Sequence, residues 1–250
     1  MKLGKLSPKY HAKTLSFAAY LKADAPPLPP EKVFREYKIP SDAWGMFAND
    51  AVGDCTCAAI AHYVMLATAH TGRLVIPEVA DVLAMYSAIS GYVPGDDSTD
   101  VGAAITDALN YWQTVGLAGH KILGWIQINH ANPVRRHQGI YIFGGNDVGV
   151  QLPAEAQLQF TAGETWDVWA DDDGGILGGH CILEAGYGSE GSDFVTWGKG
   201  DQKATDRWSN LYLDEAYCVI TEDWLNEASG LAPNMLDLDA LTKDLQALKG

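Results

Sequence analysis

The sequence predicts an α+β protein of two lobes, in which a helical lobe precedes an antiparallel β lobe. Apolar residues in the front half recur at helical spacing, whereas those in the back half fall in short runs separated by turn residues. A chain of 250 residues is long enough to build two such lobes. We expect a cleft between them, since ligand sites often form where two layers of structure meet.

Three helices are expected in the front half. The first follows Cys55, carries an apolar stripe of Ile60, Val64 and Ala67, and stops near Gly72. The other two cover residues 77–89 and 103–115.

The back half shows strand patterns with two further helices. Strands are expected at 121–128, 148–152, 180–188, 193–200 and 211–220. A helix over 133–143 places Arg135 and Arg136 on what we expect to be a solvated face. Residues 236–248 have the spacing of an amphipathic helix.

The chain divides into three parts on this basis. Residues 1–27 are basic and form an arm or a short pro-like segment, which leads into a proline-rich connector at 25–30. Residues 28–225 form the main domain, with the helical lobe at about 45–120 and the β lobe at about 121–225. Residues 226–250 form a C-terminal helical extension.

Composition narrows the possible partners. The net charge of −15 argues against nucleic acid, and the acidic run 171–173 is typical of a solvated surface. The apolar run at 15–21 is too short for a membrane span and has no signal-peptide cleavage pattern, so we expect no membrane partner and a cytoplasmic or virion-associated protein.

Four cysteines occur in the chain: Cys55, Cys57, Cys181 and Cys218. So few in this length favour free thiols in a reducing compartment. A zinc site formed by the first three and His180 is the alternative, but the C-x-C and H-C spacings are not those of zinc knuckles. We therefore expect no metal and no cofactor.

The segment Asn49–His62 is the strongest candidate for chemistry. Gly53 and Asp54 form a turn, and Cys55 then begins a helix, where free N–H groups and the helix dipole favour thiolate. Asn49 precedes the thiol by six residues, so its amide can fold back towards it. The alternative is that Cys55 is a small buried apolar residue, as most cysteines are.

A partner base follows far downstream. His180 comes directly after Gly178 and Gly179, 125 residues beyond Cys55. The two glycines would let a substrate backbone approach closely.

These motifs resemble those of the papain-like cysteine peptidases over residues 28–220. LPPEKVFREY is similar to the segment that opens the mature domain, and GAAITDALNYWQTVGL to the end of the helical lobe. HCILEAGYG and VTWG are similar to the histidine strand and the asparagine-tryptophan-glycine strand. The resemblance extends to poorly characterised bacterial and phage proteins with a GNDxxGDC-type core.

The resemblance implies a papain-like two-lobe fold and a role for each site residue. Cys55 would be the nucleophile, with Cys57 the less favoured alternative, and His180 the general base and acid. Asn49 would be an oxyanion donor and Trp197 would shield the histidine. Gly53, Asp54, Gly178 and Gly179 would line the substrate site.

Two positions depart from the family pattern. Asn49 stands where the family has glutamine, and Val195 stands where it has the asparagine that orients the histidine. An imidazole needs one nitrogen held to define its tautomer and angle. We therefore expect the second ring nitrogen of His180 to bond a carbonyl, a water, an acid or Thr196 instead.

Three functional hypotheses follow, of which the third is a metal-binding protein that uses the cysteines and His180. The first is a cysteine peptidase or amidase that acts on a peptide or protein through a thioester. The second is a papain-fold protein with weak or no activity, a binding protein or a phage structural component with a bacterial or phage partner.

Overall fold

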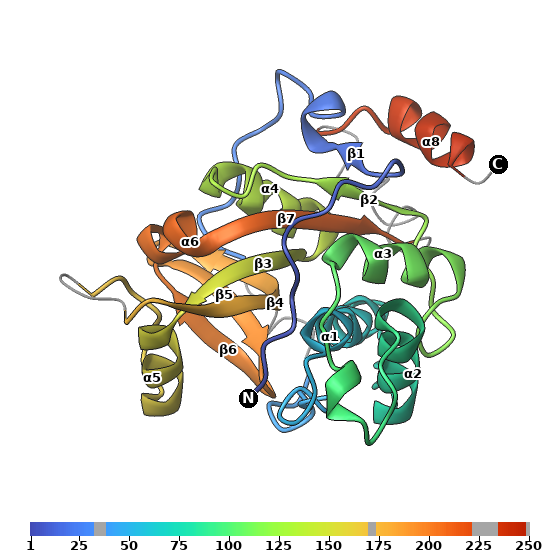
Figure 1. Ribbon diagram of the computed structural model, residues 1–250. Coiled ribbons are helices and arrows are strands. Elements are labelled where there is room, and N and C mark those ends of the chain that lie inside the picture. Colours follow the sequence, from blue (N-terminus) through green and yellow to red (C-terminus); the bar gives the residue numbers. More distant parts are fainter. Residues whose placement is uncertain (33–38, 170–173, 222–234, 249–250) are drawn as a thin grey trace.

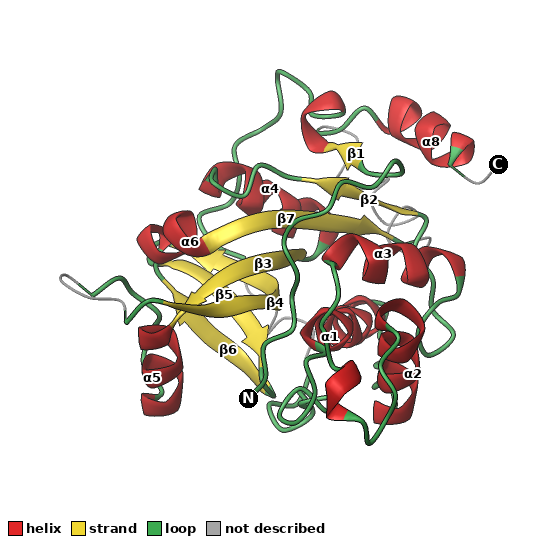
Figure 2. Ribbon diagram, viewed as in Figure 1, coloured by secondary structure: helices red, strands yellow, loops and turns green. Residues whose placement is uncertain are grey.

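The structure is a computed structural model that describes residues 1–32, 39–169, 174–221 and 235–248 (Figure 1). The expected strand-like stretch VFREYKI lies almost wholly outside these residues, as does the acidic run 171–173. The described part is an α+β arrangement, as the sequence predicts: helices α1–α3 gather beside one end of a fan of strands (Figure 2).

Helix α1, at Cys55–His70, is the centre of the helical part. Helices α2 (Val79–Ser90) and α3 (Ile105–Thr114) pack on it, and strand β4 contacts it from the sheet side. The sequence predicts a single apolar stripe on α1, yet its first twelve residues are all buried. The reason is that neighbours surround it, so small residues such as Ala58 and Ala61 are needed on every face.

Within the described ranges the sheet has seven strands, in the order β1-β2-β7-β3-β4-β5-β6. Only β1 and β2 pair in parallel, and the remaining neighbours are antiparallel. The strands are β1 Leu15–Ser16, β2 Gly124–Gln127, β3 Asn146–Pro153, β4 Ile176–Gly188, β5 Gly191–Thr196, β6 Lys199–Ala204 and β7 Leu213–Ile220.

The single strand expected at 193–200 is in fact a hairpin of β5 and β6. Trp197 and Gly198 turn the chain with φ of 46° and 74°. The sequence of β6 is largely polar, so it gives no clear strand pattern, although every second residue of the strand is buried.

The remaining helices are α4 Pro133–Phe143, α5 Ala154–Ala162, α6 Asp206–Tyr212 and α8 Leu238–Ala247, with short 3-10 turns at Phe17–Ala19 and Asp97–Thr99. Helix α8 buries Leu241 and Leu245, consistent with the predicted amphipathic pattern. None of the helices within the described ranges has the length and apolarity to cross a membrane.

Strand β4 separates two hydrophobic cores through its alternating side chains. Cys181 and Leu183 face the core that contains α1, together with Val195 of β5. Ile182 faces the opposite core, together with Phe194. This alternation decides which side chains can reach His180.

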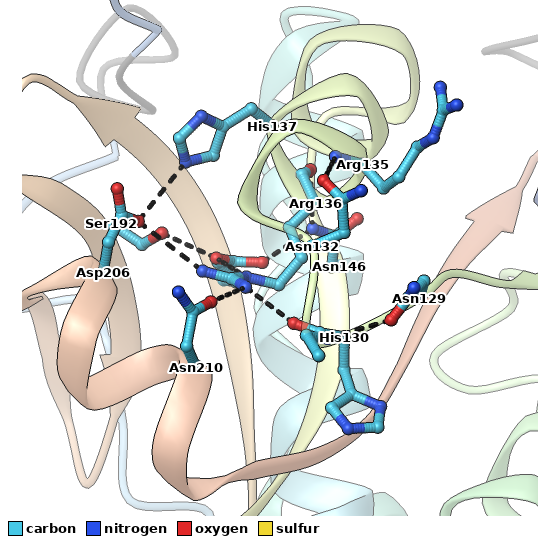
Figure 3. Close-up of polar contacts among 12 residues, drawn as sticks. Asn129, His130, Asn132, Arg135, Arg136, His137, Asn146, Ser192, Asp206 and Asn210 are labelled. Atoms are coloured by element: carbon cyan, nitrogen blue, oxygen red, sulfur yellow. Dashed lines mark hydrogen bonds and ion pairs between the residues drawn. The ribbon is translucent and has the colours of Figure 1, made fainter.

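The expectation that Arg136 lies on a solvated face is wrong. Its side chain is fully buried, and its Nε donates to Glu184 Oε1 at 3.0 Å. Figure 3 shows the guanidinium beside Asp206 and Asn210, both from α6, and beside the backbone carbonyl of His130. A helix-face pattern gives no signal of such a buried partner, because Glu184 lies 48 residues away.

Three side chains donate hydrogen bonds to the Glu184 carboxylate, and Arg136 is the first of them. Asn146 Nδ2 donates to its Oε2 at 2.7 Å, and the Ser192 hydroxyl donates to Oε1 at 2.6 Å. A buried carboxylate needs such partners because burial otherwise costs several kcal/mol. The network joins α4 to strands β3, β4 and β5, and so supports the strand that carries His180.

Candidate active site

The Cys55 thiol lies at the first residue of α1 and is buried. Burial raises its pKa to about 12, while hydrogen bonds from the backbone N–H groups of Cys181 and Gly4 oppose the rise. The thiol is therefore protonated in this arrangement and is not the expected thiolate, because desolvation outweighs the effect of the helix dipole on its pKa.

His180 lies inside strand β4 and not at its start, since β4 begins four residues earlier at Ile176. Burial lowers the pKa of its imidazole to about 3, so the ring is neutral at physiological pH. The ring stacks on Trp197, with centroids 4.4 Å apart and planes inclined by 18°.

The Nε2 atom of His180 lies 2.9 Å from the hydroxyl oxygen of Thr196. The expectation that a group other than Val195 holds the ring is confirmed, and Thr196 is that group. The family pattern predicts the orienting residue two positions before Trp197, but in the structure it is the residue directly before Trp197.

Strand register explains this shift. Val195 pairs with Leu183 and faces the α1 core, so it lies on the opposite side of the sheet from His180. Thr196, the next residue, is on the side of His180, close to an irregularity in the pairing of β5 with β6. Side chains along β5 therefore alternate between the two faces of the sheet, and this alternation places Thr196, not Val195, beside His180.

Cys55 of α1 lies beside strand β4, which carries His180, but no hydrogen bond joins the two side chains. The thiol accepts from the N–H of Cys181, the residue that follows His180. Within the described part of the chain, Nδ1 of His180 has no hydrogen-bond partner. Transfer of a proton between the two side chains would need a rearrangement or a bridging water.

Asn49 is buried close to the same turn. Its Nδ2 donates to Val52 O at 3.1 Å, which leaves its second amide hydrogen for another acceptor. Asp54 is fully buried, and burial raises the pKa of its carboxyl to about 8, while Asn49 lowers it.

The N-terminal segment lies across this site. Lys2 N–H donates to Asn49 O at 2.9 Å, and Lys5 N–H donates to Gly179 O at 3.1 Å. On the helical side, Ala103 N–H donates to Gly4 O at 2.8 Å. Residues 2–6 thus run as an extended peptide between the helices and the sheet, as the dark blue chain shows in Figure 1.

Gly4 is the residue of this segment that touches the thiol turn. A Cβ atom at Gly4 would overlap the carbonyl oxygen of Gly53. Likewise, a Cβ atom at Gly102, where φ is 79°, would overlap the Gly4 carbonyl. Three glycines therefore allow the backbones to approach.

The predicted substrate-site residues divide into two groups. Gly53, Gly178 and Gly179 meet the N-terminal segment, with Leu3 packed over Gly178. Asp54 and Trp197 lie behind the site, beneath the thiol turn and against His180 respectively. Gly4 and Lys5 also belong to the site but are not among the predicted residues, because a glycine beside a lysine in a basic arm gives little local signal.

The remaining cysteines are buried and free, and no disulfide joins any of the four. The thiol of Cys181 donates to Asp147 Oδ1 at 2.9 Å, on the side of the strand opposite His180. No cluster of metal-ligating side chains is found among the described residues.

Comparison with known proteins rests on structure alone. No protein-family profile matches the chain, and no curated protein sequence matches it. Among solved structures, it is similar to xylellain, a cysteine protease from Xylella fastidiosa, with 14% identity, a TM-score of 0.68 and coverage of 88% of this chain and 96% of that one.

Two proforms are also similar. Procathepsin B S9 from Trypanosoma congolense has 13% identity and a TM-score of 0.61, with 88% of this chain and 87% of that chain covered. The proform of the ragweed pollen cysteine protease Amb a 11 has 16% identity and a TM-score of 0.57, with 80% and 67% covered. The chain therefore has the fold of the papain-like cysteine proteases.

Proposed function

We propose that this protein is a cysteine peptidase or amidase. Cys55 would attack a peptide carbonyl as thiolate and form a thioester, which water then hydrolyses. His180, held by Thr196, would take the thiol proton and return it to the leaving amine. The side-chain amide of Asn49 and the N–H of Cys55 would stabilise the oxyanion.

The bound N-terminal segment is the observation that carries this proposal. An extended peptide already lies over Cys55, held by backbone hydrogen bonds to Asn49, Gly179 and Ala103. Backbone bonds of this kind accept any peptide with a compatible side-chain pattern. The site is thus suited to a peptide ligand.

We further propose that residues 1–27 act as a pro-like segment that keeps the site closed. The thiol meets the N–H of Gly4, not a carbonyl carbon, so the segment covers the nucleophile without offering it a bond to attack. Burial under the segment also keeps the thiol protonated, as its raised pKa indicates. Displacement of the segment would restore water and a more acidic thiol.

The experiment is alkylation of the full-length protein by iodoacetamide, combined with hydrolysis of a fluorogenic peptide library. Mass spectrometry should place the label on Cys55 once the segment is loosened by mild denaturant or by mutation. Cys55→Ala should abolish turnover, and Cys218→Ala, at a buried thiol beside Ile126, should not. Equal turnover in Cys55→Ala would refute the peptidase proposal.

The second candidate is a papain-fold binding or phage structural protein of little activity. The absence of a hydrogen bond to Nδ1 of His180 among the described residues favours it. In that case Cys55 would still be alkylated once the segment is loosened, yet the unlabelled protein under the same conditions would cleave no member of the library.

A further inference from the structure

The side chain of Lys5 is fully buried, which is unusual for a lysine. Its Nζ lies 2.9 Å from Asp214 Oδ2 and 3.1 Å from Glu215 Oε1, and it donates to Leu6 O at 3.0 Å. Of its three ammonium hydrogens, one is donated to Leu6 O and one to Asp214, and the Glu215 carboxylate adds an ion pair.

The acids around Lys5 are held in place by other side chains. Gln151 Nε2 donates to Asp214 Oδ2 at 2.6 Å, and the hydroxyl of Tyr217 donates to Glu215 Oε2 at 2.8 Å. The strands β3 and β7 supply these residues, so the arrangement is rigid. We call Gly149, Gln151, Asp214, Glu215 and Tyr217 the lysine site.

Gly149 makes room for the lysine stem. A Cβ atom at this position would overlap Cε of Lys5 and approach Asp214 Oδ1 to 2.5 Å. Gly149 pairs with Glu215 across β3 and β7, so the missing side chain lies beside the acid.

Adjacent residues of the bound arm occupy the nucleophile and the lysine site. Gly4 touches the Cys55 thiol, and the next residue, Lys5, has its N–H held by Gly179 O. A peptide that occupies the same path therefore presents one side chain to the lysine site while its neighbour lies on the thiol.

We propose that the lysine site is a specificity subsite that selects a lysine side chain of the substrate, one residue from the residue on Cys55. This rests on the proposed function. An apolar side chain of the same length would leave buried carboxylates without a partner, and sites with such unpaired polar groups reject the wrong ligand strongly. An acidic side chain would add like charge.

The first test needs no activity. In the full-length Lys5→Ala protein, n-propylammonium replaces the missing part of the side chain, and 1-propanol is its neutral isostere. We expect n-propylammonium at ten times its Kd to raise Tm by about 3 °C, whereas 1-propanol does not. The wild type, with Lys5 in place, and Lys5→Ala/Gly149→Ala, with the site filled, should show no shift.

Equal shifts with the amine and the alcohol would overturn the proposal, since the site would then be a cavity without charge selection. A shift that persists in Lys5→Ala/Glu215→Gln at its full size would overturn it too. The matched control is Lys5→Ala/Asp107→Asn, which removes an acid that pairs with Lys9 at the surface. It should keep the full shift.

The second test measures selectivity in Lys5→Ala, where the arm is less firmly held. Peptides carry lysine, norleucine or glutamate at each of the two positions on either side of the scissile bond. We expect lysine to exceed norleucine in kcat/KM by about 10²-fold at one position. Glu215→Gln should reduce that ratio to a few-fold, while Asp107→Asn should leave it unchanged.

The two proposals fail separately. If no peptide is cleaved but n-propylammonium shows its selective shift, the peptidase proposal fails and the lysine site is still a cation site. If peptides are cleaved without lysine preference at any position, the lysine site only anchors the arm and this inference is wrong.

Discussion

Thr196 holds Nε2 of His180 at 2.9 Å from its hydroxyl oxygen. The imidazole is also stacked on Trp197, so both its angle and one of its nitrogens are determined by β5 and the turn after it. A hydroxyl can donate or accept, so it permits either tautomer, and it carries no charge to stabilise an imidazolium.

Thr196→Val removes the hydroxyl with little change in shape. We expect kcat for peptide hydrolysis to fall by about 10–10²-fold, because the ring loses the contact that orients it. Thr196→Ser should restore most of the rate. The pH profile of Cys55 alkylation distinguishes this role from a packing role, since only loss of orientation should shift it.

Val195→Asn restores the residue type of the related enzymes but not its function. Val195 is fully buried in the α1 core opposite Leu183, so an amide there would lack partners. We expect a loss of about 1–3 kcal/mol in the free energy of unfolding and no gain in alkylation rate. A gain in rate near neutral pH would contradict the observed register.

Gly4→Val tests the closure of the site by the arm. The added side chain would overlap Gly53 O, and such overpacking costs about 1–3 kcal/mol, which disfavours the bound arm. We expect the alkylation rate of Cys55 to rise by about tenfold or more. Ser7→Val, at an exposed position of the same arm, is the control and should leave the rate unchanged.

Asp54→Asn should stabilise the protein in a pH-dependent way. Burial raises the pKa of Asp54 from 3.8 to about 8, so the folded state retains a proton that the unfolded state releases. Its contribution to stability is present below pH 4 and is lost as pH rises through 8. We expect Asp54→Asn to gain on the order of 6 kcal/mol above pH 8 and nothing near pH 4.

Urea unfolding at several pH values measures this gain. Asp42→Asn, at an exposed residue that is not among the charges acting on Asp54, is the control and should not reproduce the gain. A gain of the same size at every pH would mean that the effect arises from packing and not from ionisation.

Arg136→Met should be severely destabilising. Removal of the guanidinium leaves Glu184 buried with one charge uncompensated, which typically costs about 3–5 kcal/mol. Arg135→Met, one residue earlier, loses only a partly buried bond of 2.8 Å to Gln138 and should cost less than about 1 kcal/mol. Equal losses in the two variants would show that the Arg136 network contributes little.

The sequence by itself determined most of the elements and the order of the site residues, whereas helices α5 and α6 and the β5–β6 hairpin came only from the structure. Helical spacing after Cys55, the glycines before His180 and the amphipathic C-terminal helix are local patterns, because the turn of a helix and the alternation of a strand repeat over a few residues. The α+β arrangement followed from them.

Only the tertiary structure decided which side chains meet. The partner of His180 depended on sheet register and on which face of β5 lies against α1, and a shift of one residue exchanges Val195 for Thr196. The burial of Arg136 and the ion pairs of Lys5 join residues 48 and more than 200 positions apart. The pKa of Cys55 likewise depends on Gly4 lying over it, and no local pattern encodes a contact between such distant segments.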